Sequence, residues 1–179
     1  MLMNLKDLAD PFAPHDIEWR IGRAGEKNGK VWATCLAYVT NRAIMQRLDD
    51  VCGPGNWRNE IKEWTTGSPG VLSGISIKVQ REIGEERFEE WVTKWDGAEQ
   101  TDIESVKGGF SNAMKRAAVL WGIGRYLYDL PEGFANVNEN GKHRVAEAKQ
   151  KDGRIKHPAF KWDPPQLPKW ALPQPKDAA

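Results

Sequence analysis

Cysteine and histidine are scarce in this sequence, which excludes the commonest metal and redox sites. The 179 residues include two cysteines, Cys35 and Cys52, and three scattered histidines. They form no CxxC pair and no zinc-ligand spacing. We therefore expect no metal, and we predict that both cysteines are buried thiols in a reducing compartment.

Long apolar runs are missing as well. No stretch approaches the roughly 18 consecutive apolar residues of a membrane helix. The first residues, MLMNLKDLADPFAP, carry acidic side chains early and do not resemble a signal peptide. The expectation is a soluble, cytoplasmic protein without a membrane partner.

The signatures of nucleotide hydrolysis are also absent. A phosphate-binding loop needs GxxxxGK[ST], but Gly29-Lys30 has Ala24 at the upstream glycine position and Val31 after the lysine. The motifs GxSxG and HExxH do not occur either. We therefore expect no ATP-driven motor, no cofactor and no enzymatic activity.

The chain also lacks the overall positive charge that would point directly to nucleic acid. Its 26 basic and 25 acidic residues leave a formal net charge of +1. The charges are nevertheless segregated, because residues 82–104 hold nine acidic and two basic residues, whereas residues 135–179 hold nine basic and five acidic ones. Such asymmetry indicates separate faces with separate roles.

The first third of the chain predicts a hairpin followed by a helix. Residues 17–22 and 31–39 read as strands, with Asn28-Gly29 as the turn signal between them. The second strand is apolar on both faces, so we expect both of its faces to be buried. Residues 41–52 show helical spacing and stop before a Gly-Pro-Gly sequence.

An antiparallel meander of three strands comes next, joined by short, turn-like loops. In the third strand Trp91, Thr93 and Trp95 alternate with residues of the opposite face. The three strands are expected at about 56–64, 71–80 and 87–95.

A long helix is predicted from about residue 102 to 121, with its apolar residues on one side. The whole pattern predicts an α+β fold, in which the meander packs on this helix as a β-β-β-α unit. We place a folded domain at 1–134 and a basic, Pro-rich tail at 135–179. The tail is expected to be extended, anchored by Trp162 and Trp170.

The polar face of the long helix carries the most specific candidate site. Lys115 and Arg116 lie there together, flanked by Ser111 and Asn112. Two adjacent cations among small and polar residues suit a phosphate backbone that runs past the helix. The alternative is an ordinary solvated face, which the pattern alone favours.

Tryptophan is abundant, with nine residues in the chain. Bases of any sequence stack on aromatic rings, but tryptophans also fill cores. We expect packing for Trp32, Trp91 and Trp121, which stand in apolar patterns. The roles of Trp64, Trp162 and Trp170 stay open between stacking and packing.

Two further patterns allow alternative interpretations. Asp50, Glu60 and Lys62 fit a loose metal-nuclease pattern, in which paired carboxylates hold Mg²⁺ and activate water. Such triplets are common in a chain with 28% charged residues. Lys78 and Arg81 on the meander could contact a second DNA strand, although a solvated sheet edge is the simpler interpretation.

Three stretches of the chain resemble a known family. They are IESVKGGFSNAMKRAAVLWGIGRYLYDLP at 103–131, YVTNRAIMQRLDDVCGPGNW at 38–57 and the stretch 91–104. Together they resemble the Rad-fifty-two family of single-strand annealing proteins, in particular its phage and bacterial branch. The resemblance covers roughly residues 15–131, and the first stretch is the most specific.

The resemblance implies a function and assigns residues to it. Family members form rings or helical filaments with single-stranded DNA in a basic groove, its backbone inward and its bases outward. Lys115 and Arg116 match the basic pair of the family's helix, Lys107 matches another basic position, and Arg42 matches the arginine of the earlier helix. Val119 departs from the pattern, because eukaryotic members have an arginine there.

We therefore expect ATP-independent binding and annealing of single-stranded DNA in homologous recombination, by a phage-type recombinase that works as a homo-oligomer. The resemblance assigns annealing and oligomerisation to the domain at 1–134, and it places the protein in the bacterial host cytoplasm if a phage encodes it. A host or phage single-strand-binding protein or exonuclease is a further candidate partner. The alternatives are a metal-dependent nuclease and a passive single-strand-binding protein. The predicted DNA-binding residues are Arg42, Lys107, Ser111, Asn112, Lys115, Arg116 and Arg125, the last being either a groove cation or a partner for the acidic stretch.

Overall fold

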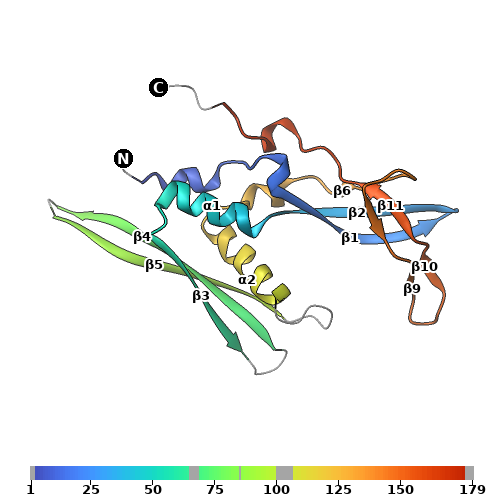
Figure 1. Cartoon of the computed structure of the whole chain (residues 1–179), viewed down its shortest axis with the longest axis horizontal. Helices are drawn as coiled ribbons and strands as arrows, with labels where there is room; N and C mark the ends of the chain where they lie inside the picture. The colour runs from blue at the N-terminus through green and yellow to red at the C-terminus, as the bar shows by residue number, and fades with distance from the viewer. Residues whose placement is uncertain (1–2, 65–68, 85, 100–106, 176–179) are drawn as a thin grey trace.

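The computed structural model describes residues 3–64, 69–84, 86–99 and 107–175. It confirms the predicted α+β fold: a hairpin, a short helix, an antiparallel meander and a longer helix follow one another along the chain. In Figure 1 the meander crosses the lower left of the molecule, and the hairpin and C-terminal strands extend to the right. Helix α2 lies in the angle between them.

The hairpin consists of β1 (Ile17–Lys27) and β2 (Lys30–Val39). Asn28 and Gly29 have φ values of 53° and 72°, as a two-residue type I′ turn requires. The first strand is longer than predicted, since pairing continues to Lys27 opposite Lys30 past one irregularity between Ile21 and Arg23. The polar residues before the turn are therefore strand residues.

The two faces of the hairpin have different environments. On one face Ala24, Ala33 and Cys35 are buried, whereas on the other Leu36 is 51% exposed and Trp32 is 40% exposed. The predictions that β2 is buried on both faces and that Trp32 packs in the core are therefore wrong. Among the described residues, the other face is covered at Thr34 but left open at Trp32 and Leu36.

Helix α1 (Asn41–Cys52) begins after Thr40, whose hydroxyl accepts a hydrogen bond from the Ala43 N–H at 3.2 Å. It ends at Gly53, which has a φ of 83°. The N-terminal 3-10 helices η1 (Leu5–Ala9) and η2 (Pro14–Asp16) precede the hairpin. As predicted, both cysteines are free, buried thiols.

The meander is an antiparallel sheet in the order β3-β4-β5, formed by β3 (Trp57–Trp64), β4 (Gly70–Ile83) and β5 (Glu86–Glu99). Its second and third strands run on through the predicted loop, with pairing as far as Ile83 opposite Glu86. Trp91 of β5 is 41% exposed, so the prediction that it packs in the core is wrong.

Helix α2 (Lys107–Leu120) packs on β4 and β5. The Trp121 indole N–H donates to the Ile75 carbonyl at 2.9 Å, which fastens the end of the helix to the centre of the sheet. Trp121 packs against the core as predicted. The predicted first turn, at 102–106, lies outside the described residues.

The C-terminal segment braces the hairpin. Phe160 and Trp162 are buried against Ala24, Ala33 and Cys35, while Trp170 is 50% exposed. The predicted domain boundary at residue 134 stays a prediction. The segment comprises η3 (Arg125–Asp129), β6 (Gly133–Phe134), β7 (Asn136–Val137), β8 (His143–Val145), β9 (Ala148–Lys149), β10 (Ile155–His157), β11 (Phe160–Asp163) and η4 (Lys169–Ala171).

Candidate nucleic-acid interface

A groove of about 330 Å³ separates the hairpin from α2, and we call it the central groove. Strands β1 and β2 form one wall, α2 forms the other, and the segment around η3 closes one end. Its polar lining residues are Arg20, Tyr38, Asn112, Lys115, Arg116 and Tyr128. Three of the predicted DNA-binding residues therefore meet in one concave site.

Lys115 spans the groove from α2 to the hairpin. Its side chain is only 11% exposed, and its ammonium group forms an ion pair with Glu18 of β1. Arg20 pairs with the same carboxylate at 3.2 Å. Both cations lie near the ring of Tyr38, at 5.7 Å for Lys115 and 5.8 Å for Arg20. The hairpin and α2 thus bring together a compact group of two cations, one carboxylate and one aromatic ring.

Arg116 lies at the rim of the groove and is much more accessible. Its side chain is 55% exposed, and its guanidinium pairs with Asp96 of β5 at 3.0 Å. Both cations that were predicted to hold phosphate therefore already have a carboxylate partner within the chain. Counting Arg20, the group has three cations against two carboxylates, so one positive charge is in excess.

The other predicted residues have varied positions. Ser111 accepts a hydrogen bond from the Asn41 amide at 3.0 Å, which joins α1 to α2. The amide oxygen of Asn41 is buried and has no hydrogen-bond partner among the described residues. Arg42 follows it on α1 and is exposed. Lys107 begins α2, but its side chain lies outside the described part of the chain.

Arg125 has a position that neither sequence interpretation anticipated. Its guanidinium donates to the carbonyls of Val119 at 2.7 Å and Leu120 at 2.9 Å, the last residues of α2. A cation at this end satisfies helix carbonyls and suits the helix dipole. A role of Arg125 in DNA binding stays a prediction.

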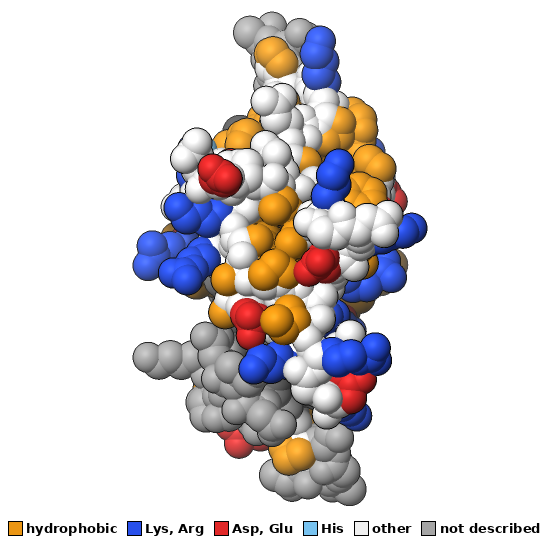
Figure 2. Space-filling view, turned by 90° about the vertical axis from the view of Figure 1, so that its right-hand side faces the viewer, with side chains coloured by type: hydrophobic (Ala, Val, Ile, Leu, Met, Phe, Trp, Pro, Cys, Tyr) orange, Lys and Arg blue, Asp and Glu red, His pale blue; other side chains and the backbone are white. Residues whose placement is uncertain are grey.

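The exposed face of the hairpin continues the groove outward, and sequence reasoning missed it. The Trp32 ring lies flat over Gly25, where an added Cβ atom would approach the ring to 2.9 Å. Lys27 and Lys30 pair across the strands beyond it and are exposed. Figure 2 views this end of the molecule and shows hydrophobic side chains in the middle with Lys and Arg side chains on both sides. One signal in the sequence could have revealed this exposed face. In β2, Lys30, Trp32 and Tyr38 alternate with positions that are buried.

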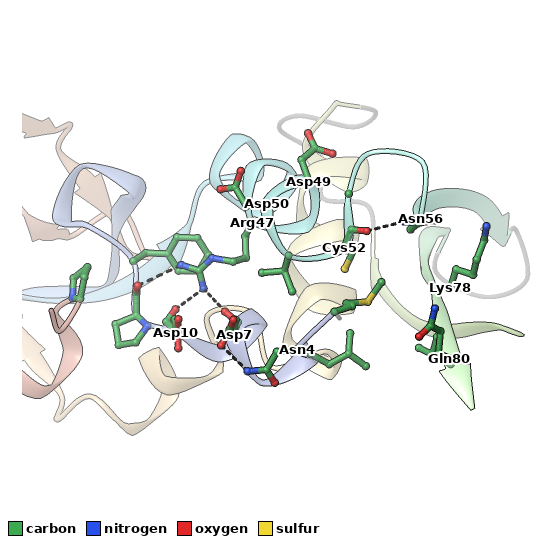
Figure 3. Close-up of a pocket in the computed structure, with 18 of the residues that line it drawn as sticks. Asn4, Asp7, Asp10, Arg47, Asp49, Asp50, Cys52, Asn56, Lys78 and Gln80 are labelled. Carbon is green, nitrogen blue, oxygen red and sulfur yellow. Dashed lines mark hydrogen bonds between the residues drawn. The ribbon is translucent and has the colours of Figure 1, made fainter. Parts of the chain in front are cut away.

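A larger hollow, of about 1440 Å³, lies on another side between the N-terminal segment, α1 and β4. Carboxylates, among them Asp49 and Asp50, outnumber the cations in its lining, and Arg47 extends across it (Figure 3). Arg47 donates to the backbone carbonyls of Asp10 at 2.8 Å and Asp7 at 3.0 Å. A hollow lined in this way repels a polyanion, so its size does not make it the DNA site.

The residues of the alternative nuclease pattern do not form a group. Asp50 accepts a hydrogen bond from Gln46 at 2.9 Å on α1. Glu60 pairs with Arg58 at 3.4 Å on β3, and the Lys62 ammonium lies 4.2 Å from the centre of the Trp95 ring. Within the described ranges, no three His, Cys, Asp or Glu side chains gather in a way that could hold a metal ion.

Comparison with known proteins places this geometry in context. Residues 4–146 match the family described as Rad52/22 family double-strand break repair protein. The chain is 33% identical over 171 residues to the single-stranded DNA-binding protein DdrA of Deinococcus deserti, covering 94% of this chain and 69% of that protein. It is 32% identical to DdrA of Deinococcus radiodurans, covering 94% and 67%. No solved structure matches this chain.

Among the described helices, none is both long enough and apolar enough to cross a membrane.

Proposed function

Because this chain belongs to the Rad52/22 family of double-strand break repair proteins, we propose that it binds single-stranded DNA and anneals complementary strands without ATP or another cofactor. The two DdrA relatives, both named as single-stranded DNA-binding proteins, support the choice of ligand. We propose further that it acts in homologous recombination as a homo-oligomer of the phage and bacterial type.

One observation carries the proposal: Lys115, Arg116 and Arg20 converge on one groove beside Tyr38 and Asn112. The cations bind phosphates, and the groove wall keeps the backbone inward, so the bases remain free to pair. Base pairing itself drives annealing, so no fuel is needed. Trp32 and Lys30, which extend the groove along the hairpin, supply a stacking surface and a further cation.

The carboxylates of Glu18 and Asp96 adjust the strength of this site. A phosphate must replace or share the ion pairs of Lys115 and Arg116. One copy therefore binds weakly, and many copies on one strand bind tightly through effective concentration. Weak individual contacts also allow a strand to shift its register while it searches for its complement.

The first experiment replaces both groove cations, Lys115→Ala with Arg116→Ala, and measures binding of a labelled oligothymidylate against salt. We expect a normal fold, a loss of affinity of about ten-fold or more at moderate salt, and a salt slope lower by about 1.4, from ~0.7 per phosphate contact. The matched control is Arg81→Ala with Arg87→Ala, which likewise removes two ion-paired cations, both of them exposed and outside the groove. Unchanged affinity of the groove variant would reject the assignment.

A second experiment separates annealing from its alternatives. Complementary oligonucleotides should pair faster with the protein present, in EDTA and without ATP. Tight binding with no gain in annealing rate would instead select a passive single-strand-binding protein. Degradation of DNA in Mg²⁺ that Glu60→Gln abolishes would select the nuclease.

A further inference from the structure

Strands β9 and β10 form a narrow ribbon in the C-terminal segment. Ile155 pairs with Lys149, and Gly153, with a φ of 84°, allows the tight turn between the two strands. Residues 148–157 carry four basic side chains and one acidic side chain, and all four basic ones are exposed. We call residues 148–157 the basic ribbon, which projects at the lower right of the molecule in Figure 1.

The charge of the basic ribbon is only partly balanced within the chain. Lys149 and Arg154 each have one carboxylate partner, at 3.9 and 2.8 Å, whereas Lys151 and Lys156 have none among the described residues. Ile155, between two of these cations in the sequence, is 55% exposed. The ribbon therefore offers one apolar side chain among cations that still lack a partner.

The hollow between the N-terminal segment, α1 and β4 has the opposite charge. Its lining includes seven carboxylates and two cations, Arg47 and Lys78. Both cations are already engaged, Arg47 by backbone carbonyls and Lys78 by Glu89 at 3.5 Å. Asp49 and Asp50 accept hydrogen bonds from neutral groups at 2.7 and 2.9 Å, and neither has a cation partner in the described part of the chain. The hollow therefore has an excess of negative charge that the described residues do not neutralise.

The floor of the hollow is apolar, and its size suits a segment of polypeptide. Met3, Leu5, Val51 and Val79 line the hollow and also pack against the core. The volume of about 1440 Å³ exceeds the roughly 300–1000 Å³ of small-molecule sites. A cationic segment with one apolar side chain matches both the charge of the hollow and its floor.

The hollow and the basic ribbon lie toward opposite ends of the molecule. Figure 1 shows η1 and α1, which border the hollow, in the left half and β9 and β10 at the right end. The ribbon cannot reach the hollow of its own chain, so a neighbouring copy must supply it. A contact between unlike surfaces of identical chains repeats from copy to copy and builds a ring or a filament. DNA is the alternative ligand of a basic ribbon, but the exposed residues at 149–156 include no aromatic ring on which a base could stack.

We propose that the hollow of one copy holds the basic ribbon of the next. Lys151 and Lys156 then lie near the carboxylates of Asp49 and Asp50, and Ile155 packs on the apolar floor. The inference rests on the proposed homo-oligomer and names the contact that builds it. Neither surface shares a lining residue with the central groove, so the contact does not occupy the groove.

Charge reversal on each surface tests the contact by light scattering without DNA. The ribbon variant is Lys151→Glu with Lys156→Glu. The hollow variant is Asp50→Lys with Glu82→Lys, at two exposed residues of the lining. Each variant alone should have a mass about two-fold or more below that of the unmodified protein, because like charges then face each other. Circular dichroism should show an unchanged fold.

An equimolar mixture of the two variants is the decisive measurement. In the mixture each reversed ribbon meets a reversed hollow, and each native ribbon meets a native hollow. The mass should therefore rise to about two-fold or more above that of either variant alone. The matched control is Lys142→Glu with Lys161→Glu, which makes the same change at two exposed lysines outside the ribbon. The mass of this control should equal that of the unmodified protein.

A mixture that stays as small as its components would overturn the contact. So would an equal loss of mass in the control, since assembly would then depend on overall charge. Unchanged mass in both reversed variants would overturn it too and leave the homo-oligomer to other surfaces. Weaker oligothymidylate binding by the ribbon variant at unchanged mass would make the ribbon a DNA contact instead. A monomeric unmodified protein that still binds and anneals single-stranded DNA would reject this contact and retain the DNA-binding function.

Discussion

The ion pair between Lys115 and Glu18 controls how much positive charge the central groove offers. Replacing Glu18 with Gln removes a carboxylate that competes with phosphate for Lys115 and Arg20. We expect single-strand affinity to rise about three- to ten-fold, equivalent to about 1 kcal/mol, the scale of a partly exposed ion pair. Fluorescence anisotropy with labelled oligothymidylate measures it.

The control for this variant is Glu132→Gln, because Glu132 also pairs with an arginine, Arg23, but outside the groove. The affinity of Glu132→Gln for labelled oligothymidylate should equal that of the unmodified protein. A fall in affinity for Glu18→Gln would mean that the carboxylate positions Lys115 for DNA rather than competing with it.

Cys52 should be slow to react, because burial raises the pKa of its thiol to about 11. The thiolate is the nucleophile, so at pH 8 nearly all of this group is in its unreactive form, and the rate should rise as pH approaches that pKa. Mass spectrometry after iodoacetamide treatment should find Cys52 unmodified in the native protein and modified in urea. Rapid native labelling at pH 8 would contradict the buried position.

At the residue scale, sequence reasoning found cations but not their partners. Lys115 and Arg116 follow from a helix-face pattern, and both do lie at the groove. Glu18 is 97 positions from Lys115 in the chain, and Asp96 is 20 positions from Arg116. Pairing across such separations depends on tertiary packing, which periodicity does not encode.

Among the elements, α1 contacts the N-terminal segment through the side chain of Arg47. Arg47 donates to the carbonyls of Asp7 and Asp10, and its guanidinium lies 4.1 Å from the centre of the Phe12 ring. Arg47→Ala removes the guanidinium donor from both carbonyls and the cation from the Phe12 ring, so we expect a loss of about 2–3 kcal/mol. The melting temperature should fall by roughly 5–10 °C for a chain of this size.

Differential scanning calorimetry measures this change. Gln46→Ala, one position earlier on the same helix and exposed, serves as the control and should have little effect. A melting temperature for Arg47→Ala equal to that of the control would show that the segment is held by its apolar residues alone.

The β1–β2 hairpin should contribute to DNA binding through its exposed face. Trp32→Ala removes the aromatic surface over Gly25, and the loss of one stacked base costs about 1–3 kcal/mol. Affinity for oligothymidylate should therefore fall about five-fold or more. Phe134→Ala removes a ring that is 64% exposed on β6 and is the control. Equal affinities of the two variants would remove Trp32 from the interface.

The elements themselves were predictable where they are long and periodic. Helix α1, the Asn28-Gly29 turn and the order of the meander strands follow directly from the sequence. The C-terminal strands do not, because β6, β7 and β9 have two residues each, too few to show alternation. For the same reason the sequence could not indicate that the tail covers only one face of β2.

For the whole molecule, the segregation of charge predicts assembly through unlike faces. We expect light scattering to give a mass several times the 20.2 kDa of one chain, and high salt to reduce it if the contacts are ionic. A stable monomer that still anneals DNA would contradict the polymer.

Part of the acidic stretch is neutralised within the chain: Glu82 pairs with Arg87, Glu89 with Lys78 and Glu90 with Arg81. We predict that this stretch as a whole contributes to contacts between copies.

The one excess positive charge that each copy brings to its central groove has a consequence for strand length. A short oligonucleotide spans few copies and gathers only a few such charges, so it dissociates quickly. A long strand would contact one excess positive charge in every copy along its length. It would dissociate only when all of these contacts are broken at the same time. The proposed assembly would thus retain long single strands and release fragments that are too short to specify a unique match.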